Sequence, residues 1–111
     1  MKTLRGRVAS KTERIIEGTV KMVSPENFSM DASEIKGKIM VAEFTFVDLE
    51  FLMKHAKAVL TERGGLLSHA AIISREFGIP CVVGIKNLTK ELKDGDRIRI
   101  DFETGKIYVI S

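Results

Sequence analysis

Apolar and polar side chains alternate along much of this chain, and two stretches instead carry apolar side chains at helical spacing. Alternation and short apolar runs are typical of strands, whereas recurrence at three to four residues is typical of amphipathic helices. The predicted strands are residues 4–9, 13–23, 38–42, 58–61 and 81–85. The predicted helices are residues 47–54 and 68–77. Mixed in this order, the patterns predict an α/β fold.

One strand–helix–strand unit lies in the middle of the chain. Strand 58–61 runs into the paired glycines Gly64 and Gly65, helix 68–77 follows, and strand 81–85 completes the unit. A right-handed crossover makes the two strands parallel and puts the glycine turn at their carboxyl edge. Because α/β folds bind ligands at that edge, the turn is the first candidate for a functional site.

The rest of the chain is expected to complete a single mixed sheet. Residues 24–38 are polar, so we expect a surface loop with at most a short turn of helix. Residues 94–110 alternate on both sides of a glycine-bearing turn, which predicts a closing β-hairpin. We therefore expect one compact domain over residues 1–111 with two or three helices, in which residues 1–13 form an extension or a first strand.

Composition and charge argue against several classes of function. The 111 residues are 44% hydrophobic with a formal net charge of +3, and the basic excess lies within residues 1–38. No basic run or interleaved aromatic pattern marks a nucleic-acid surface, and no apolar run approaches the roughly 20 residues that cross a bilayer. The N-terminus lacks the apolar core of a signal peptide, and Cys81 is the single cysteine. We therefore expect a cytoplasmic protein with no nucleic-acid or membrane partner, and a buried, inert Cys81 thiol.

The sequence Gly64-Gly65-Leu66-Leu67-Ser68-His69 places a histidine at the start of a predicted helix. Paired glycines let the backbone turn tightly, and Ser68 is a good helix N-cap. The first N–H groups of a helix bind anions, so a histidine at this position can carry a phosphoryl group beside them. A histidine that merely caps or packs the helix is the alternative, but that role does not need the paired glycines. We therefore predict His69 as the catalytic residue.

The segment from Gly64 to Gly84 closely resembles the signature of the mobile, swivelling phosphohistidine domain of phosphoenolpyruvate-utilising enzymes. That family includes pyruvate phosphate dikinase, phosphoenolpyruvate synthase, enzyme I of the sugar phosphotransferase system and, as a relative, rifampicin phosphotransferase. The resemblance begins upstream of the glycines with Thr61-Glu62-Arg63 and covers residues 14–110. It implies a single swivelling β/β/α domain.

The resemblance implies that His69 is phosphorylated, usually on the tele nitrogen of the ring, and relays the phosphoryl group between two sites on other domains. One site uses ATP and the other uses phosphoenolpyruvate and pyruvate. We therefore expect a stand-alone phosphocarrier that works in trans with a nucleotide-binding protein and a phosphoenolpyruvate-binding barrel protein. Magnesium and ATP are expected on those partners, with no cofactor and no metal bound directly to this chain, because no spacing of ligands predicts a metal site.

The same resemblance assigns phosphate-binding or site-shaping roles to the residues around His69. Gly64, Gly65 and Ser68 shape the turn. Apart from the resemblance, the position of Arg63 beside Gly64 suits it either to attract phosphate or an acidic partner surface, or simply to be solvated. Thr45 is similar to the threonine of an upstream Thr-x-Pro turn that lies near the histidine in the family.

Two positions depart from the family pattern. Several members carry threonine at the position of Leu67, so a hydroxyl contact there, and any regulation that uses it, is absent from this chain. Val47 replaces the proline of the Thr-x-Pro turn, which weakens the assignment of Thr45.

Other side chains of the two helices are expected to be structural. Arg75 lies six residues beyond His69, about 120° around the helix, which favours a structural or docking role over phosphate contact. Ile73 and Phe77 share a face with Ala70 and are predicted to be core. His55 has no ligand spacing to His69 and is predicted to be a surface residue.

Two other functions are compatible with parts of this pattern. A non-catalytic binding or regulatory module could keep the swivelling fold without phosphotransfer. A hydrolase using Ser68 and His69 is disfavoured, because adjacent residues cannot easily form the nucleophile-to-base hydrogen bond and no orienting carboxylate is evident. A phosphotransferase component is the favoured interpretation, and as such this chain is not a complete enzyme on its own.

Overall fold

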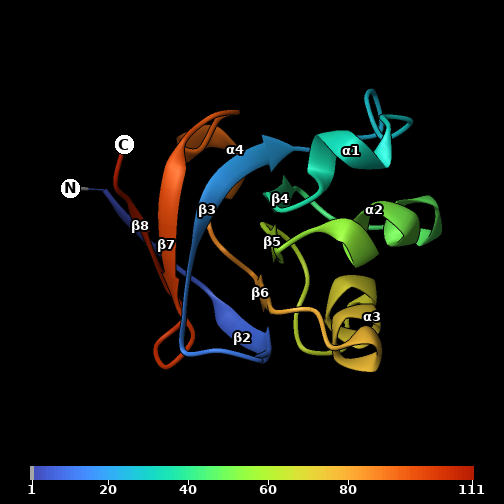
Figure 1. Cartoon of the computed structure of the whole chain (residues 1–111). Coiled ribbons are helices and arrows are strands. Elements are labelled where there is room, and N and C mark those ends of the chain that lie inside the picture. Colours follow the sequence, from blue (N-terminus) through green and yellow to red (C-terminus); the bar gives the residue numbers. More distant parts are fainter. Residues whose placement is uncertain (1) are drawn as a thin grey trace.

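The computed structural model describes residues 2–111 and shows a mixed sheet that curls into a nearly closed barrel, with three helices on one side (Figure 1). Its strands are β1 (Thr3–Arg5), β2 (Arg7–Ser10), β3 (Ile15–Met22), β4 (Ile39–Ala42), β5 (Ala58–Thr61), β6 (Cys81–Val83), β7 (Arg97–Asp101) and β8 (Lys106–Val109). Its helices are α1 (Ala32–Ile35), α2 (Glu50–His55), α3 (His69–Phe77) and α4 (Leu88–Glu91), with a 3-10 turn η1 (Val47–Leu49) before α2.

The strands follow the order β1-β8-β7-β3-β4-β5-β6-β2. Strands β3 to β6 are parallel neighbours, and every other pairing is antiparallel. Strands β5 and β6 with the connecting helix α3 form the predicted strand–helix–strand unit, and β7 with β8 form the predicted closing hairpin. Both predictions are confirmed.

The first strand departs from the sequence expectation. Residues 4–9 were expected to form one strand, but the structure divides them at Gly6 into β1, which pairs with β8, and β2, which pairs with β6. Because β1 and β2 are the first and last strands of the strand order, one short segment forms both edges of the sheet. The Gly6 N–H donates to the carbonyl of Gly105 at 3.0 Å. The alternation of apolar and polar residues cannot reveal such a division, because it continues through both halves of the segment.

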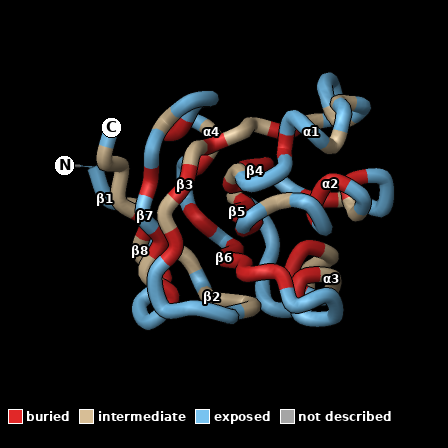
Figure 2. The backbone as a smooth tube through the Cα atoms, viewed as in Figure 1, coloured by how far each residue is buried: buried red, intermediate tan, exposed pale blue. Residues whose placement is uncertain are grey.

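Two apolar clusters hold the sheet in place, one inside the curled sheet and one between the sheet and α1, α2 and α3. Strand β4 contributes to both, since Ile39 and Val41 belong to the inner cluster and Met40 to the outer one. Figure 2 shows the buried residues concentrated along β4, β5 and β6 and on the helix faces next to them. These strands are buried on both faces, which explains why they are continuous apolar runs in the sequence.

Helix α3 begins and ends with the predicted local signals. Ser68 is the N-cap, and its Oγ accepts a hydrogen bond from the Ala71 N–H at 3.4 Å. Gly78 ends the helix in the left-handed conformation at φ +67°, where a side chain is disfavoured. These caps explain why the position of this helix could be predicted from the sequence.

The buried face of α3 differs from the prediction. Ala70, Ala71 and Ser74 face the sheet, so the helix approaches it through small side chains. Phe77 was expected in the core but is 46% exposed. The Lys54 Nζ lies 4.2 Å above its ring, so Phe77 packs along the surface against α2 instead.

Helix α4 was not predicted from the sequence. It is short, and a tertiary contact holds its first turn: the Glu62 carboxylate accepts hydrogen bonds from the Thr89 N–H at 2.8 Å and from its Oγ1 at 2.7 Å. These hydrogen bonds lower the pKa of Glu62. Among residues 2–111, no helix is long and apolar enough to cross a membrane.

We predict that Gly105→Ala destabilises the domain more than Gly37→Ala. Both glycines have positive φ, +79° and +75°, so each alanine costs roughly 1–2 kcal/mol in backbone strain. A Cβ at Gly37 meets open space, whereas one at Gly105 overlaps the Gly6 carbonyl, which adds roughly 1–3 kcal/mol of overpacking. Urea unfolding followed by circular dichroism measures both losses. Equal losses of unfolding free energy in the two variants would contradict the close approach of Gly105, in the β7–β8 hairpin, to Gly6, between β1 and β2.

Candidate functional site

The glycine turn between β5 and α3 is tied together by Ser68. Gly64 adopts φ +99°, and a Cβ built on it would lie 2.7 Å from the Ser68 Cβ. The Ser68 N–H and Oγ both donate to the Gly65 carbonyl, at 3.1 and 2.8 Å. Gly64 is therefore needed for its conformation and for space, whereas a Cβ on Gly65 would meet nothing within 4 Å.

His69 is the first residue of α3, and both of its ring nitrogens have partners. The Oγ1 of Thr45 lies 2.7 Å from Nδ1, and the Oε2 of Glu50 lies 2.8 Å from Nε2. The side chains of His69 and Glu50 are 26% and 27% exposed, while Thr45 is buried. Three elements converge on this ring: α3, the connection after β4, and the start of α2.

The chemistry of these partners restricts where the ring protons lie. An ionised carboxylate accepts hydrogen bonds and cannot donate, so Glu50 accepts from a protonated Nε2. In a neutral ring, the Thr45 hydroxyl then donates to Nδ1. The hydroxyl can also accept from Nδ1–H, so Thr45 orients the ring whichever nitrogen carries the proton.

The two arginines of this region make other contacts. The Arg63 Nε pairs with the Glu43 carboxylate at 2.8 Å, at an exposed position. The Arg75 Nη2 donates to the Leu66 carbonyl at 2.6 Å and so braces the glycine turn from α3. Leu67, at the tip of the turn, is 86% exposed.

The structure thus brings together only some of the predicted site residues. Thr45 contacts His69, and Gly64, Gly65 and Ser68 build the turn that carries it, whereas Arg63 is turned toward Glu43. Glu50 was missed by sequence reasoning. Its only sequence signal is an acidic side chain in the first turn of the predicted helix 47–54, and nothing local shows that this helix starts beside the next one.

The other candidate groups take no part in the site. Cys81 is buried, as predicted, and burial raises the pKa of its thiol to about 11. His55 is exposed, as predicted, and its Nδ1 lies 2.8 Å from the Phe51 carbonyl. Within residues 2–111, no group of three or more His, Cys, Asp or Glu side chains is arranged to hold a metal ion.

Comparison with known proteins shows the family of this chain. The family model described as "PEP-utilising enzyme, mobile domain" matches residues 34–105, and PEP is phosphoenolpyruvate. The chain belongs to this family. An uncharacterized phosphotransferase of Bacillus subtilis is 45% identical over 98 residues, which is 87% of this chain and 11% of the relative. The phosphoenolpyruvate synthase of Pyrococcus furiosus is 50% identical over 82 residues, 70% of this chain and 10% of the relative.

Solved structures support the same fold. The Enzyme I (nEIt) protein aligns with a TM-score of 0.59 and 30% identity over 72% of this chain and 34% of its own. A chain of aconitase X from Thermococcus kodakaraensis aligns over 100% of both chains with a TM-score of 0.73, but at 20% identity this likeness concerns the fold alone. This chain spans about a tenth of the length of the two curated relatives, so it corresponds to one domain of those proteins.

We predict that Gly64→Ala displaces Ser68 and disturbs the start of α3, while Gly95→Ala does not. Gly95 is a matched control, because its φ of +91° is close to the +99° of Gly64 and a Cβ there meets open space. Loss of the Ser68 cap adds about 1 kcal/mol to the strain that both variants share. Urea unfolding measures the difference, and histidine ring NMR shifts report whether His69 has moved. Unchanged His69 shifts in Gly64→Ala would contradict the role of the turn.

Proposed function

We propose that this domain is a phosphocarrier that accepts a phosphoryl group on Nε2 of His69 and relays it between two sites on partner domains. The observation that carries the proposal is the position of the ring, partly exposed at the first residue of α3 with Nδ1 held by Thr45. Membership of the mobile-domain family supports it.

The chemistry follows from the hydrogen bonds of the ring. Attack by Nε2 requires its lone pair, so the ring proton must be on Nδ1, where the Thr45 Oγ1 can accept it. The start of α3 favours an anionic phosphoryl group by about 0.3–1 kcal/mol through the helix dipole. Ser68 and Gly64 hold this helix start in place.

The partners are proposed from the relatives. A phosphoenolpyruvate synthase is among them, so we propose one partner domain that binds ATP with magnesium and a barrel domain that binds phosphoenolpyruvate or pyruvate. Each partner would approach the same edge of the sheet, where His69 lies. We place the exchange in the cytoplasm, since a single buried cysteine needs no oxidising compartment.

We predict that His69→Ala abolishes phosphorylation of the domain, while His55→Ala leaves it intact. The assay mixes each variant with labelled phosphoenolpyruvate and a phosphoenolpyruvate synthase that lacks its own mobile domain. Phosphohistidine is labile in acid and stable in base, so the label on the wild type should behave in that way. His55 is the matched control, because it is the other histidine of the chain and lies at the end of α2.

Equal labelling of wild type and His69→Ala would contradict the proposal. The alternative, a binding or regulatory module without phosphotransfer, predicts partner binding with no label on any variant. The same experiment therefore separates the two functions.

A further inference from the structure

The Glu50 carboxylate occupies the position that a phosphoryl donor needs. Its Oε2 lies 2.8 Å from Nε2 of His69, in hydrogen-bonding geometry with that ring nitrogen. The lone pair of an unprotonated Nε2 points in the direction that its N–H takes. A reacting phosphorus atom must come within about 3–3.5 Å along this direction. The Glu50 carboxylate and a phosphoryl donor therefore cannot occupy this position at the same time.

We propose that Glu50 is a positioning residue that masks Nε2 of His69 and must withdraw before the ring can accept a phosphoryl group. The inference rests on the proposed function, because it concerns the nitrogen that reacts there. In the masked state, Glu50 keeps the ring proton on Nε2, and the neutral ring is not a nucleophile at that nitrogen. The histidine of the free domain is thereby protected from adventitious phosphoryl donors.

Unmasking of Nε2 requires a change of the ring tautomer, and phosphoryl transfer follows it. Nε2 loses its proton to water, Nδ1 gains one, and the Thr45 hydroxyl changes from donor to acceptor. The Nε2 lone pair then forms the new N–P bond while the bond from phosphorus to the leaving group breaks. Its electron pair stays on the leaving atom, which is oxygen in phosphoenolpyruvate and, in phosphoramidate, the nitrogen released as ammonia. The phosphoryl oxygens are anionic, so the Glu50 carboxylate is repelled from its former position.

The fold offers the displaced carboxylate another place on the same helix. Lys54 lies four residues after Glu50 on α2, the spacing at which glutamate and lysine side chains meet. Its Nζ lies over the ring of Phe77, the last residue of α3. Rotation of the Glu50 side chain toward Lys54 would then free Nε2 of His69.

The test uses phosphoramidate, a small phosphoryl donor that needs no partner protein. Its reaction with His69 is measured relative to His55 in the same molecule by mass spectrometry of the base-stable products. His55 is an internal reference because the Phe51 carbonyl accepts from its Nδ1–H, which leaves Nε2 available. We expect the ratio to rise about tenfold in Glu50→Gln and Glu50→Ala, the size of effect expected from losing a charge-assisted hydrogen bond.

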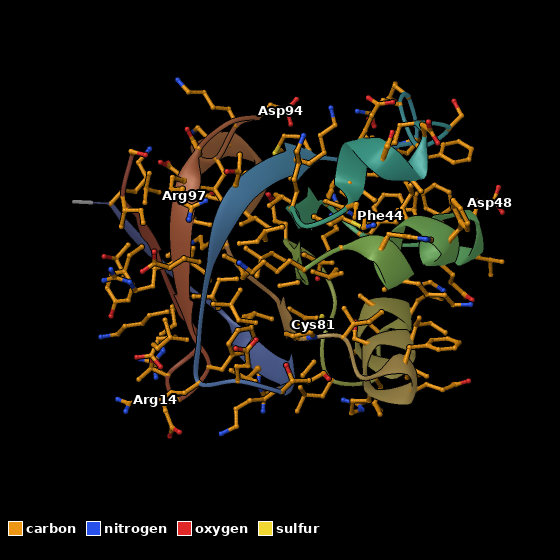
Figure 3. The ribbon with its side chains drawn as sticks, viewed as in Figure 1. Arg14, Phe44, Asp48, Cys81, Asp94 and Arg97 are labelled. Carbon is orange, nitrogen blue, oxygen red and sulfur yellow. The ribbon has the colours of Figure 1, made fainter. Side chains whose placement is uncertain are left out.

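Asp48→Asn is the matched control. Asp48 lies two residues before Glu50 in η1, is exposed, and points away from the domain in Figure 3. Its replacement removes the same charge from the same segment, so the reactivity ratio should equal that of the wild type. Circular dichroism of each variant checks that it is folded.

A second readout is spectroscopic. Nitrogen-15 NMR of the ring should show protonated Nε2 in the wild type and Asp48→Asn, and an increased Nδ1–H population in the Glu50 variants. A reactivity ratio that stays unchanged, or falls, in both Glu50 variants would overturn the proposal. Failure of the proposed function has another signature, namely the absence of partner-dependent label on His69, and the phosphoramidate ratio does not depend on it.

Discussion

The parallel arrangement of β4, β5 and β6 is the constraint on which the site depends. Parallel neighbours end at the same edge of the sheet, so the segments that follow them must emerge side by side. Thr45 and Glu50 follow β4, and His69 follows β5. Residues that lie 24 and 19 positions from the histidine in the sequence therefore meet its two ring nitrogens.

The phosphocarrier role that we propose for His69 also needs a rigid support, because a reacting ring that is misplaced by about 1 Å can lose a large part of its rate. The domain supplies this support at two levels. Apolar clusters on both faces of the central strands fix the sheet, and the first strand segment closes it around Gly6. Ser68 and Arg75 then fix the turn through hydrogen bonds to Gly65 and Leu66.

Much of the fold could be predicted from the sequence, because its signals are local. Caps at Ser68 and Gly78 delimit α3, and continuous apolar runs mark the strands that are buried on both faces. Long-range features could not be predicted in this way. The division at Gly6 depends on which edges the two halves reach, and α4 depends on the contact between Glu62 and Thr89.

In the candidate site, too, local features could be predicted from the sequence and a long-range contact could not. The turn and His69 have a compact local pattern, and the resemblance to the family added Thr45. Glu50 has no such pattern, since a glutamate in the first turn of a helix usually serves the helix itself. Only the packing of α2 beside α3 gives it a partner, and this contact provides the most specific hypothesis about the chemistry of the domain.

In the function we propose, Nε2 of His69 carries the phosphoryl group. Phosphorus–nitrogen correlation NMR on the phosphorylated chain, with nitrogen-15 in its histidines, tests this most directly. We predict one phosphorus signal coupled to Nε2 of His69, with Nδ1 still hydrogen-bonded to Thr45. Coupling to Nδ1 of His69, or to a nitrogen of His55 alone, would contradict it.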